Sequence, residues 1–141
     1  MPQISGHQAS AGRPPRGAIV PCAPCRGEIK RHRVISADGH DLMVTTVTTS
    51  SGFMTGAYPI QYGYQVMICQ PICEQRLPDE AAASEEHDAL VRALADAGVS
   101  VVRARRKLAA RSRAERADAA REITVDRPRR VRVATAVAAA L

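Results

Sequence analysis

The run Tyr64-Gln-Val-Met-Ile-Cys69 opens the stretch that decides the predicted fold. A loop containing proline follows it, then an amphipathic segment from Asp79 to Ala97, then Gly98 and a second apolar run, Val99-Ser-Val-Val102. An apolar run, an amphipathic segment, a glycine and another apolar run are the pattern of a strand–helix–strand unit. The sequence therefore predicts an α+β protein with a small mixed sheet. Its central unit covers residues 64–104 and should cross over in the right-handed sense.

The predicted helix carries its own start and stop signals. Asp79 is a suitable N-cap, because its carboxylate can accept hydrogen bonds from the first backbone N–H groups. Gly98 can adopt the left-handed conformation that commonly ends a helix. Residues that should face a core recur at helical spacing between these ends, namely Ala83, His87, Leu90, Val91 and Leu94. This position makes His87 a core histidine, and a nucleophilic Cys73–His87 pair is the alternative.

The residues before this unit predict a β-hairpin. Glu28–Ile35 and Leu42–Thr48 are the two strands, the second of them rich in Val and Thr. Asp38-Gly39 predicts a two-residue turn between them, because both central positions of a type I′ turn need a positive φ. Ser50–Gly63 contains three glycines and one proline, which favours a loop.

The charge of the chain is concentrated near its C-terminal end. The 141 residues have a formal net charge of +6, yet the segment from Arg103 to Arg132 holds twelve basic and four acidic residues. A basic appendage on a near-neutral body suits a polyanionic partner. The predicted organisation is a disordered tail at 1–21, a small α+β domain at 22–104 and a basic helical or extended tail at 105–141.

An arginine-rich helix is predicted at the start of the basic segment, and its cations are candidates for nucleic-acid contact. The six candidates are Arg103, Arg105, Arg106, Lys107, Arg111 and Arg113. They cover most of the helix circumference. Contact with phosphates needs only charge density, so the expected binding is nonspecific and sensitive to salt. The helix has no aromatic residue for stacking on bases and no base-reading motif. A solvated helix without a partner is the alternative.

Two cysteine pairs are candidate metal ligands. Cys22 and Cys25 are separated by two residues, and Cys69 and Cys73 by three. Each spacing lets one turn offer two thiolates to the same ion, and two such turns complete a tetrahedral site suited to Zn²⁺. Across residues 22–73, the order of cysteine turn, hairpin, loop, strand and second cysteine turn resembles a zinc ribbon. The resemblance implies a structural zinc ion held by the four cysteines.

Other chemistry remains open for these residues. Cys22-Ala-Pro-Cys25 resembles the active-site turn of thioredoxin-like oxidoreductases, although Gly27 interrupts the helix that should follow the motif. His32 and His40 are spare imidazole ligands for a metal site. The sequence contains no HExxH, GxSxG or glycine-rich phosphate loop.

These features lead to one working hypothesis. The chain is predicted to be a small, non-enzymatic accessory or regulatory protein that is stabilised by zinc and binds nucleic acid through its basic helix. A thiol-dependent enzyme or enzyme fragment is one alternative, and a little-structured reading frame without a defined activity is another. The apolar runs are too short to span a membrane and no secretory signal opens the chain, which predicts a cytoplasmic location.

Overall fold

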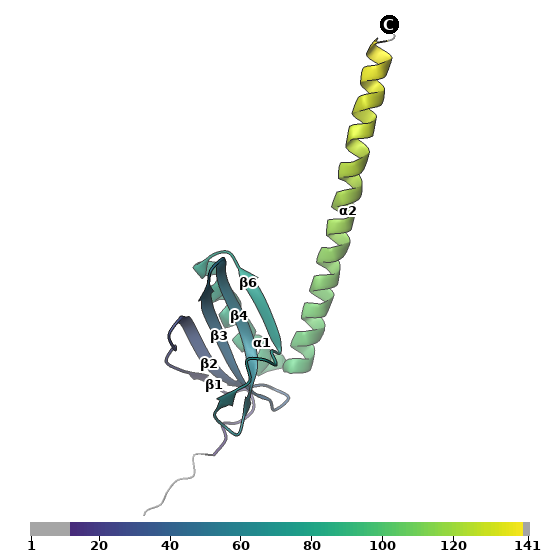
Figure 1. Cartoon of the computed structure of the whole chain (residues 1–141). Helices are drawn as coiled ribbons and strands as arrows, with labels where there is room; N and C mark the ends of the chain where they lie inside the picture. The colour runs from purple at the N-terminus through teal and green to yellow at the C-terminus, as the bar shows by residue number, and fades with distance from the viewer. Residues whose placement is uncertain (1–11, 140–141) are drawn as a thin grey trace, which may run out of the picture. The chain divides into compact units, whose positions relative to one another are not determined.

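A computed structural model describes the backbone of residues 12–139 and the side chains of residues 12–123. The fold is α+β, with an antiparallel sheet of six strands and two helices (Figure 1). The elements in chain order are β1 (Ile19–Pro21), β2 (Glu28–Ile35), β3 (Asp41–Thr49), β4 (Gly52–Gln61), β5 (Gln65–Val66), β6 (Cys73–Leu77), α1 (Glu80–Ala97) and α2 (Val99–Ala139). The chain divides into two compact units, one ending at Arg103 and the other beginning at Ala104.

Strands β1 to β4 pair in sequence order, each antiparallel to the next. The free edge of β4 is shared by two short strands. β5 pairs with Ile60 and Gln61, and β6 pairs with the segment from Phe53 to Ala57 (Figure 1). Every strand pairing in the described part of the chain is antiparallel, so the mixed sheet and its right-handed crossover were wrong predictions.

The hairpin formed by β2 and β3 confirms the two strands predicted around Asp38-Gly39. Its connection is wider than a two-residue turn, because the last paired residues are Ile35 and Asp41. Gly39 has a φ of 88°, whereas Asp38 keeps a negative φ. The turn with two positive φ values is instead Tyr62-Gly63, which joins β4 to β5.

Strand β4 occupies most of the segment that the sequence predicted to be a loop. Gly56 lies inside this strand because the ring of Tyr58 covers it: a Cβ atom at Gly56 would lie 2.5 Å from the Tyr58 hydroxyl oxygen. This close approach explains a glycine in the middle of a strand. Gly56 therefore reflects side-chain packing and not a break in the strand, whereas Gly52 and Gly63 have positive φ values at its two ends.

Helix α1 packs on one face of the sheet and closes the hydrophobic core (Figure 1). The sequence predicted its boundaries correctly, with Asp79 as N-cap and Gly98 as C-cap. The core residues from the sheet are Val34, Leu42, Val44 and Ala57, and those from the helices are Leu90, Val91, Leu94, Ala95, Val99 and Val102. Alternate residues of β3 therefore point toward α1, as the twofold period of a strand requires.

The second apolar run, Val99–Val102, is helical, so the predicted strand after Gly98 was wrong. The physical reason lies in the β2–β3 turn. The carboxylate of Asp38 accepts hydrogen bonds from the backbone N–H groups of Val99 (3.0 Å) and Ser100 (3.3 Å). These two donors belong to the first turn of α2, where they have no partner within the helix. Asp38 therefore caps α2 from a distant position in the sequence.

Three further segments differ from prediction. The predicted disordered tail at 1–21 contains β1, because Ile19–Pro21 pairs with the free edge of β2 through backbone groups that need no apolar side chains; residues 1–11 lie outside the described chain. The predicted strand at 64–69 is reduced to β5, since only Gln65 and Val66 face β4. The C-terminal segment, predicted to be helical or extended, is helical up to Ala139.

Candidate functional site

A chain of hydrogen-bonded polar side chains crosses the interface between the sheet and α1. His32 Nδ1 lies 2.8 Å from His87 Nε2, and His87 Nδ1 lies 2.9 Å from the hydroxyl oxygen of Thr46. Thr46 in turn lies 2.8 Å from the hydroxyl oxygen of Thr55, which donates to the carbonyl oxygen of Ala83. His87, Thr46 and Thr55 are almost completely buried. The predicted core position of His87 is confirmed.

The direction of every hydrogen bond in this chain follows from its inner end. Thr55 donates its single hydroxyl proton to the Ala83 carbonyl oxygen, so it must accept a hydrogen bond from the Thr46 hydroxyl. Thr46 then has no proton left and accepts from Nδ1–H of His87. His87 Nε2 is therefore the bare nitrogen, and it accepts from Nδ1–H of His32. Both ring nitrogens of His87 are used, which leaves none to activate Cys73.

The surroundings of His87 favour its neutral form. Burial is the largest effect, and the neighbouring His32 and Lys30 add to it, lowering the pKa of His87 from its ordinary value to about 4. Asp88 acts in the opposite direction, but its carboxylate pairs with the Lys30 ammonium group at 3.0 Å. Neutral His87 is the form that the hydrogen-bond chain needs, because a proton on Nε2 would face the N–H of His32.

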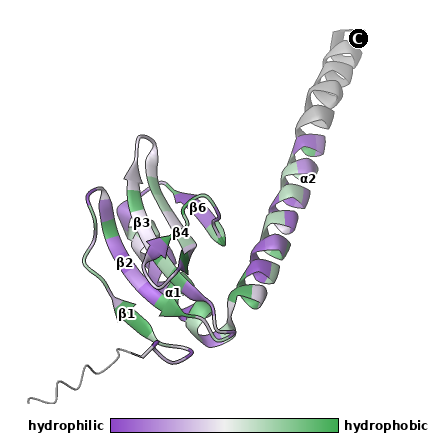
Figure 2. Ribbon diagram, turned by 60° about the horizontal axis from the view of Figure 1, so that its bottom comes forward, coloured by the Kyte–Doolittle hydropathy of each residue, from purple (hydrophilic) through white to green (hydrophobic). Residues whose placement is uncertain are grey.

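The six predicted nucleic-acid contacts lie on α2, at and just beyond the boundary between the two units. Arg103, Lys107 and Arg111 follow one another at steps of four residues and share one face of the helix. No side chain from residue 103 to residue 123 is buried, and Leu108 and Ile123 are 67% and 70% exposed. Figure 2 shows hydrophilic residues spread along this part of α2, without a continuous hydrophobic stripe.

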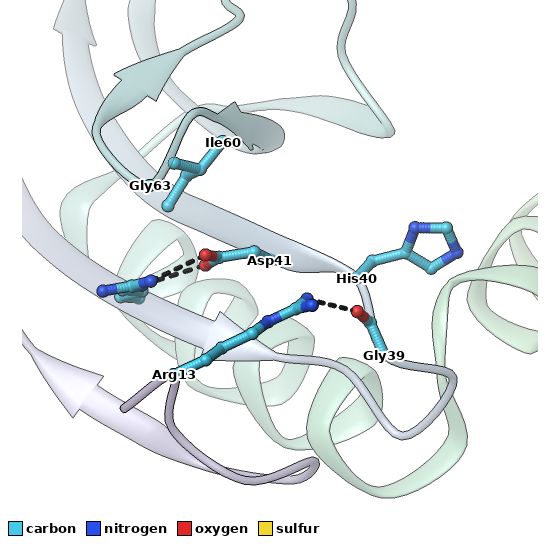
Figure 3. A pocket seen from close by; sticks show the side chains of 7 residues that line it. Arg13, Gly39, His40, Asp41, Ile60 and Gly63 are labelled. Atoms are coloured by element: carbon cyan, nitrogen blue, oxygen red, sulfur yellow. Dashed lines mark hydrogen bonds and ion pairs between the residues drawn. The ribbon is translucent and has the colours of Figure 1, made fainter. Parts of the chain in front are cut away.

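A second basic surface borders the β2–β3 turn. A cavity of about 560 Å³ there is lined by Arg13, Arg33, Gly39, His40, Asp41, Ile60 and Gly63 (Figure 3). Two hydrogen bonds join the guanidinium of Arg33 to Asp41, at 2.9 and 2.6 Å, and they raise the pKa of Arg33. The guanidinium of Arg13 donates to the carbonyl oxygen of Gly39. The ring of His40 points away from Asp41 in Figure 3, so these residues form no metal-ligand cluster.

The fold does not bring the two cysteine pairs together. Cys22 follows β1 at one edge of the sheet, whereas Cys73 opens β6 beyond β4. Four strand spacings separate β1 from β6, or about 19 Å between their backbones. None of the four cysteines forms a disulfide, and the described residues hold no group of three or more His, Cys, Asp or Glu side chains placed to bind a metal ion. The zinc site stays a prediction, which metal analysis of the purified protein tests.

An exposed aromatic turn joins β4 to β5 and was not predicted from the sequence. Tyr62 and Tyr64 are 80% and 81% exposed at the β4–β5 turn, and Tyr62 has a φ of 54°. A bulky residue in this left-handed region is uncommon and costs energy. The adjacent Gly63 was the available signal, because a residue followed by glycine between two strands is typical of a type I′ turn.

Comparison of the chain with protein-family models, with curated proteins and with solved structures found no match. Among the described residues, no helix is both long enough and apolar enough to cross a membrane.

Proposed function

We propose that the protein is a non-enzymatic nucleic-acid-binding protein whose helix α2 contacts the phosphate backbone without reading the bases. One observation carries the proposal: residues 103–114 of α2 hold six basic and no acidic residues, and none of their side chains is buried. Each cation on such a helix can release a condensed counterion when it meets a phosphate. The folded unit that ends at Arg103 is proposed to give the protein its accessory or regulatory role, while the basic part of α2 contacts the nucleic acid.

The exposure of α2 supports this proposal over a role in packing. A helix that packs within a protein presents an apolar stripe, and Leu108 and Ile123 are too far apart to provide one. Its exposed ion pairs, Arg111 with Glu115 (3.5 Å) and Arg121 with Asp118 (3.9 Å), add little stability. Charge is therefore the main property that this surface offers to a partner.

The test compares two variants of equal charge. R103Q/R105Q/K107Q/R113Q removes four exposed cations from α2 and leaves the Arg111–Glu115 pair intact. The matched control, R13Q/R16Q/R26Q/R76Q, removes four exposed cations from the sheet unit. Glutamine has a helix propensity close to that of arginine, so α2 should keep its helicity. The measurement is fluorescence anisotropy of a labelled 20-base-pair DNA duplex at 50 mM salt.

The α2 variant should bind the duplex at least tenfold more weakly than the wild type, because every lost cation removes a phosphate contact. The control variant should stay within about threefold of the wild type. An equal loss of duplex affinity in the two variants would show that only the net charge of the protein matters, and it would overturn the role of α2. Absence of duplex binding by the wild type at 50 mM salt would overturn the function itself.

A further inference from the structure

The face of the sheet that points away from α1 holds a cavity of about 370 Å³. Thr45, Val47, Met54 and Tyr58 form its floor on β3 and β4, and Val66 and Ile68 approach from the segment that starts at β5. Glu28 and Arg31 border it on β2, and Glu74 borders it on β6. This size and this largely apolar lining are those of a site for a small organic molecule.

One carboxylate at this cavity is incompletely satisfied. Glu28 Oε1 accepts a hydrogen bond from Arg31 at 2.8 Å, and only 11% of the Glu28 side chain is exposed. The other oxygen, Oε2, is buried and has no hydrogen-bond partner among the described residues. A buried carboxylate oxygen without a donor is costly, so the negative charge of Glu28 is incompletely compensated beside the cavity.

The other polar groups of the cavity do not compensate the charge of Glu28 further. The hydroxyl of Tyr58 is engaged, because it donates to Glu74 Oε1 at 2.9 Å. The same guanidinium nitrogen of Arg31 that reaches Glu28 also lies 3.3 Å from Cys25 Sγ. Glu28 and Glu74 together outweigh Arg31, so the charged groups that line the cavity sum to a net negative charge. Charge complementarity therefore selects a cation.

We propose that this cavity binds a small organic ammonium ion, with its N⁺–H group at the carboxylates of Glu28 and Glu74 and its apolar body over Val47, Met54 and Ile68. An ammonium group balances the negative charge of the two carboxylates, while the apolar body fills the largely apolar lining. No residue of α2 lines this site, and the proposal does not depend on the proposed nucleic-acid binding.

The experiment titrates the full chain at pH 7 with n-hexylamine, which is protonated, and with 1-hexanol and hexanoate as a neutral and an anionic probe of the same length. Binding is followed by isothermal titration calorimetry and by the NMR shifts of the Met54 methyl group. The variants are E28Q, the matched exposed control E85Q on α1, and M54W, which fills the cavity from its floor. The comparison of the three probes on the wild type needs no variant.

Hexylammonium should bind the wild type and E85Q equally, shift the Met54 resonance, and bind E28Q about tenfold to a hundredfold more weakly. M54W should not bind it. The alcohol should bind at least tenfold more weakly than the amine, and hexanoate more weakly still. Equal affinities for amine and alcohol, or an amine affinity unchanged in both E28Q and M54W, would overturn the proposal.

Discussion

His32 Nδ1 donates a hydrogen bond to His87 Nε2 over 2.8 Å, and this pair links strand β2 to helix α1. His32 is partly exposed, whereas His87 is fully buried. The pair is therefore the outer end of a polar chain that runs through Thr46 and Thr55 to the backbone of α1. A buried network of this kind is stabilising only while each member keeps its partner.

Truncation of His87 tests that dependence. H87A should lower the free energy of unfolding by about 2–4 kcal/mol, because it opens a cavity and leaves Thr46 without its donor. H87N should lose less unfolding free energy than H87A, since the asparagine amide N–H can still donate to Thr46. H40A removes an exposed histidine and should stay within about 0.5 kcal/mol of the wild type. Urea denaturation measures all three variants, and equal stabilities of H87A and H40A would contradict the network.

The pH dependence of stability follows from the same residue. His87 has a pKa of about 4 in the folded chain and about 6.5 when unfolded, so below pH 6.5 the unfolded chain binds a proton that the folded chain does not. Stability should therefore fall as the pH drops from 6.5 to 4, by up to about 3 kcal/mol. Denaturation at half-unit pH steps measures this loss.

H87N is the control for the pH experiment, because asparagine does not titrate. Asp38 and Asp88 have pKa values below their usual range, so their stabilising contributions are lost only below about pH 4. The loss between pH 6.5 and 4 should thus be much smaller in H87N. The same pH profile in H87N and the wild type would show that other groups carry the dependence.

Asp38 illustrates what the sequence could not reveal. The signals for α1 are local: Asp79 accepts from the backbone N–H of Ala82 at 2.7 Å, and Gly98 ends the helix, so a short window was enough. The run Val99–Val102 has no local signal that separates a buried strand from a buried helical turn. Its helical state depends on a carboxylate about sixty positions earlier, which pattern alone does not connect to it.

Removal of the Asp38 carboxylate should destabilise the start of α2. Although burial alone would raise the pKa of Asp38, hydrogen bonds from Ser36 and from the N–H groups of Val99 and Ser100 hold it well below its usual range. D38A should cost about 1–2 kcal/mol in unfolding free energy, as the loss of a helix cap does. D96A, at an exposed position of α1, is the control and should change stability by less than about 0.5 kcal/mol. No difference between these variants would contradict the cap.

Substitution of Tyr62 should stabilise the protein, in contrast to the substitutions of His87 and Asp38. Asparagine tolerates a φ of 54° better than tyrosine does and is preferred in this turn type. Y62N should therefore raise the unfolding free energy by about 0.5–1 kcal/mol. Y64N, at the neighbouring exposed tyrosine, relieves no strain and should not stabilise. A destabilised Y62N protein would show that the tyrosine ring makes a contact worth more than the strain.

The candidate sites also differ in whether they depend on local or on long-range contacts. The six cations of α2 could be named from the sequence, because a charged run needs no tertiary partner to be recognised. The His32–His87 pair and the Glu28 cavity could not, since each joins residues from different elements. The spacing within each cysteine pair, Cys22 with Cys25 and Cys69 with Cys73, predicts only that the two thiols of a pair are near each other. It carries no information on the distance between the pairs, which depends on the three strands between β1 and β6.

The salt dependence of duplex binding tests the role of α2 most directly. The observed binding constant should fall on a log–log plot against salt with a slope of about −0.9 for each phosphate contacted. R103Q/R105Q/K107Q/R113Q should therefore have a slope about 3.6 units shallower than that of the wild type, while R13Q/R16Q/R26Q/R76Q keeps the wild-type slope. Identical slopes for the wild type and the α2 variant would contradict the proposed function.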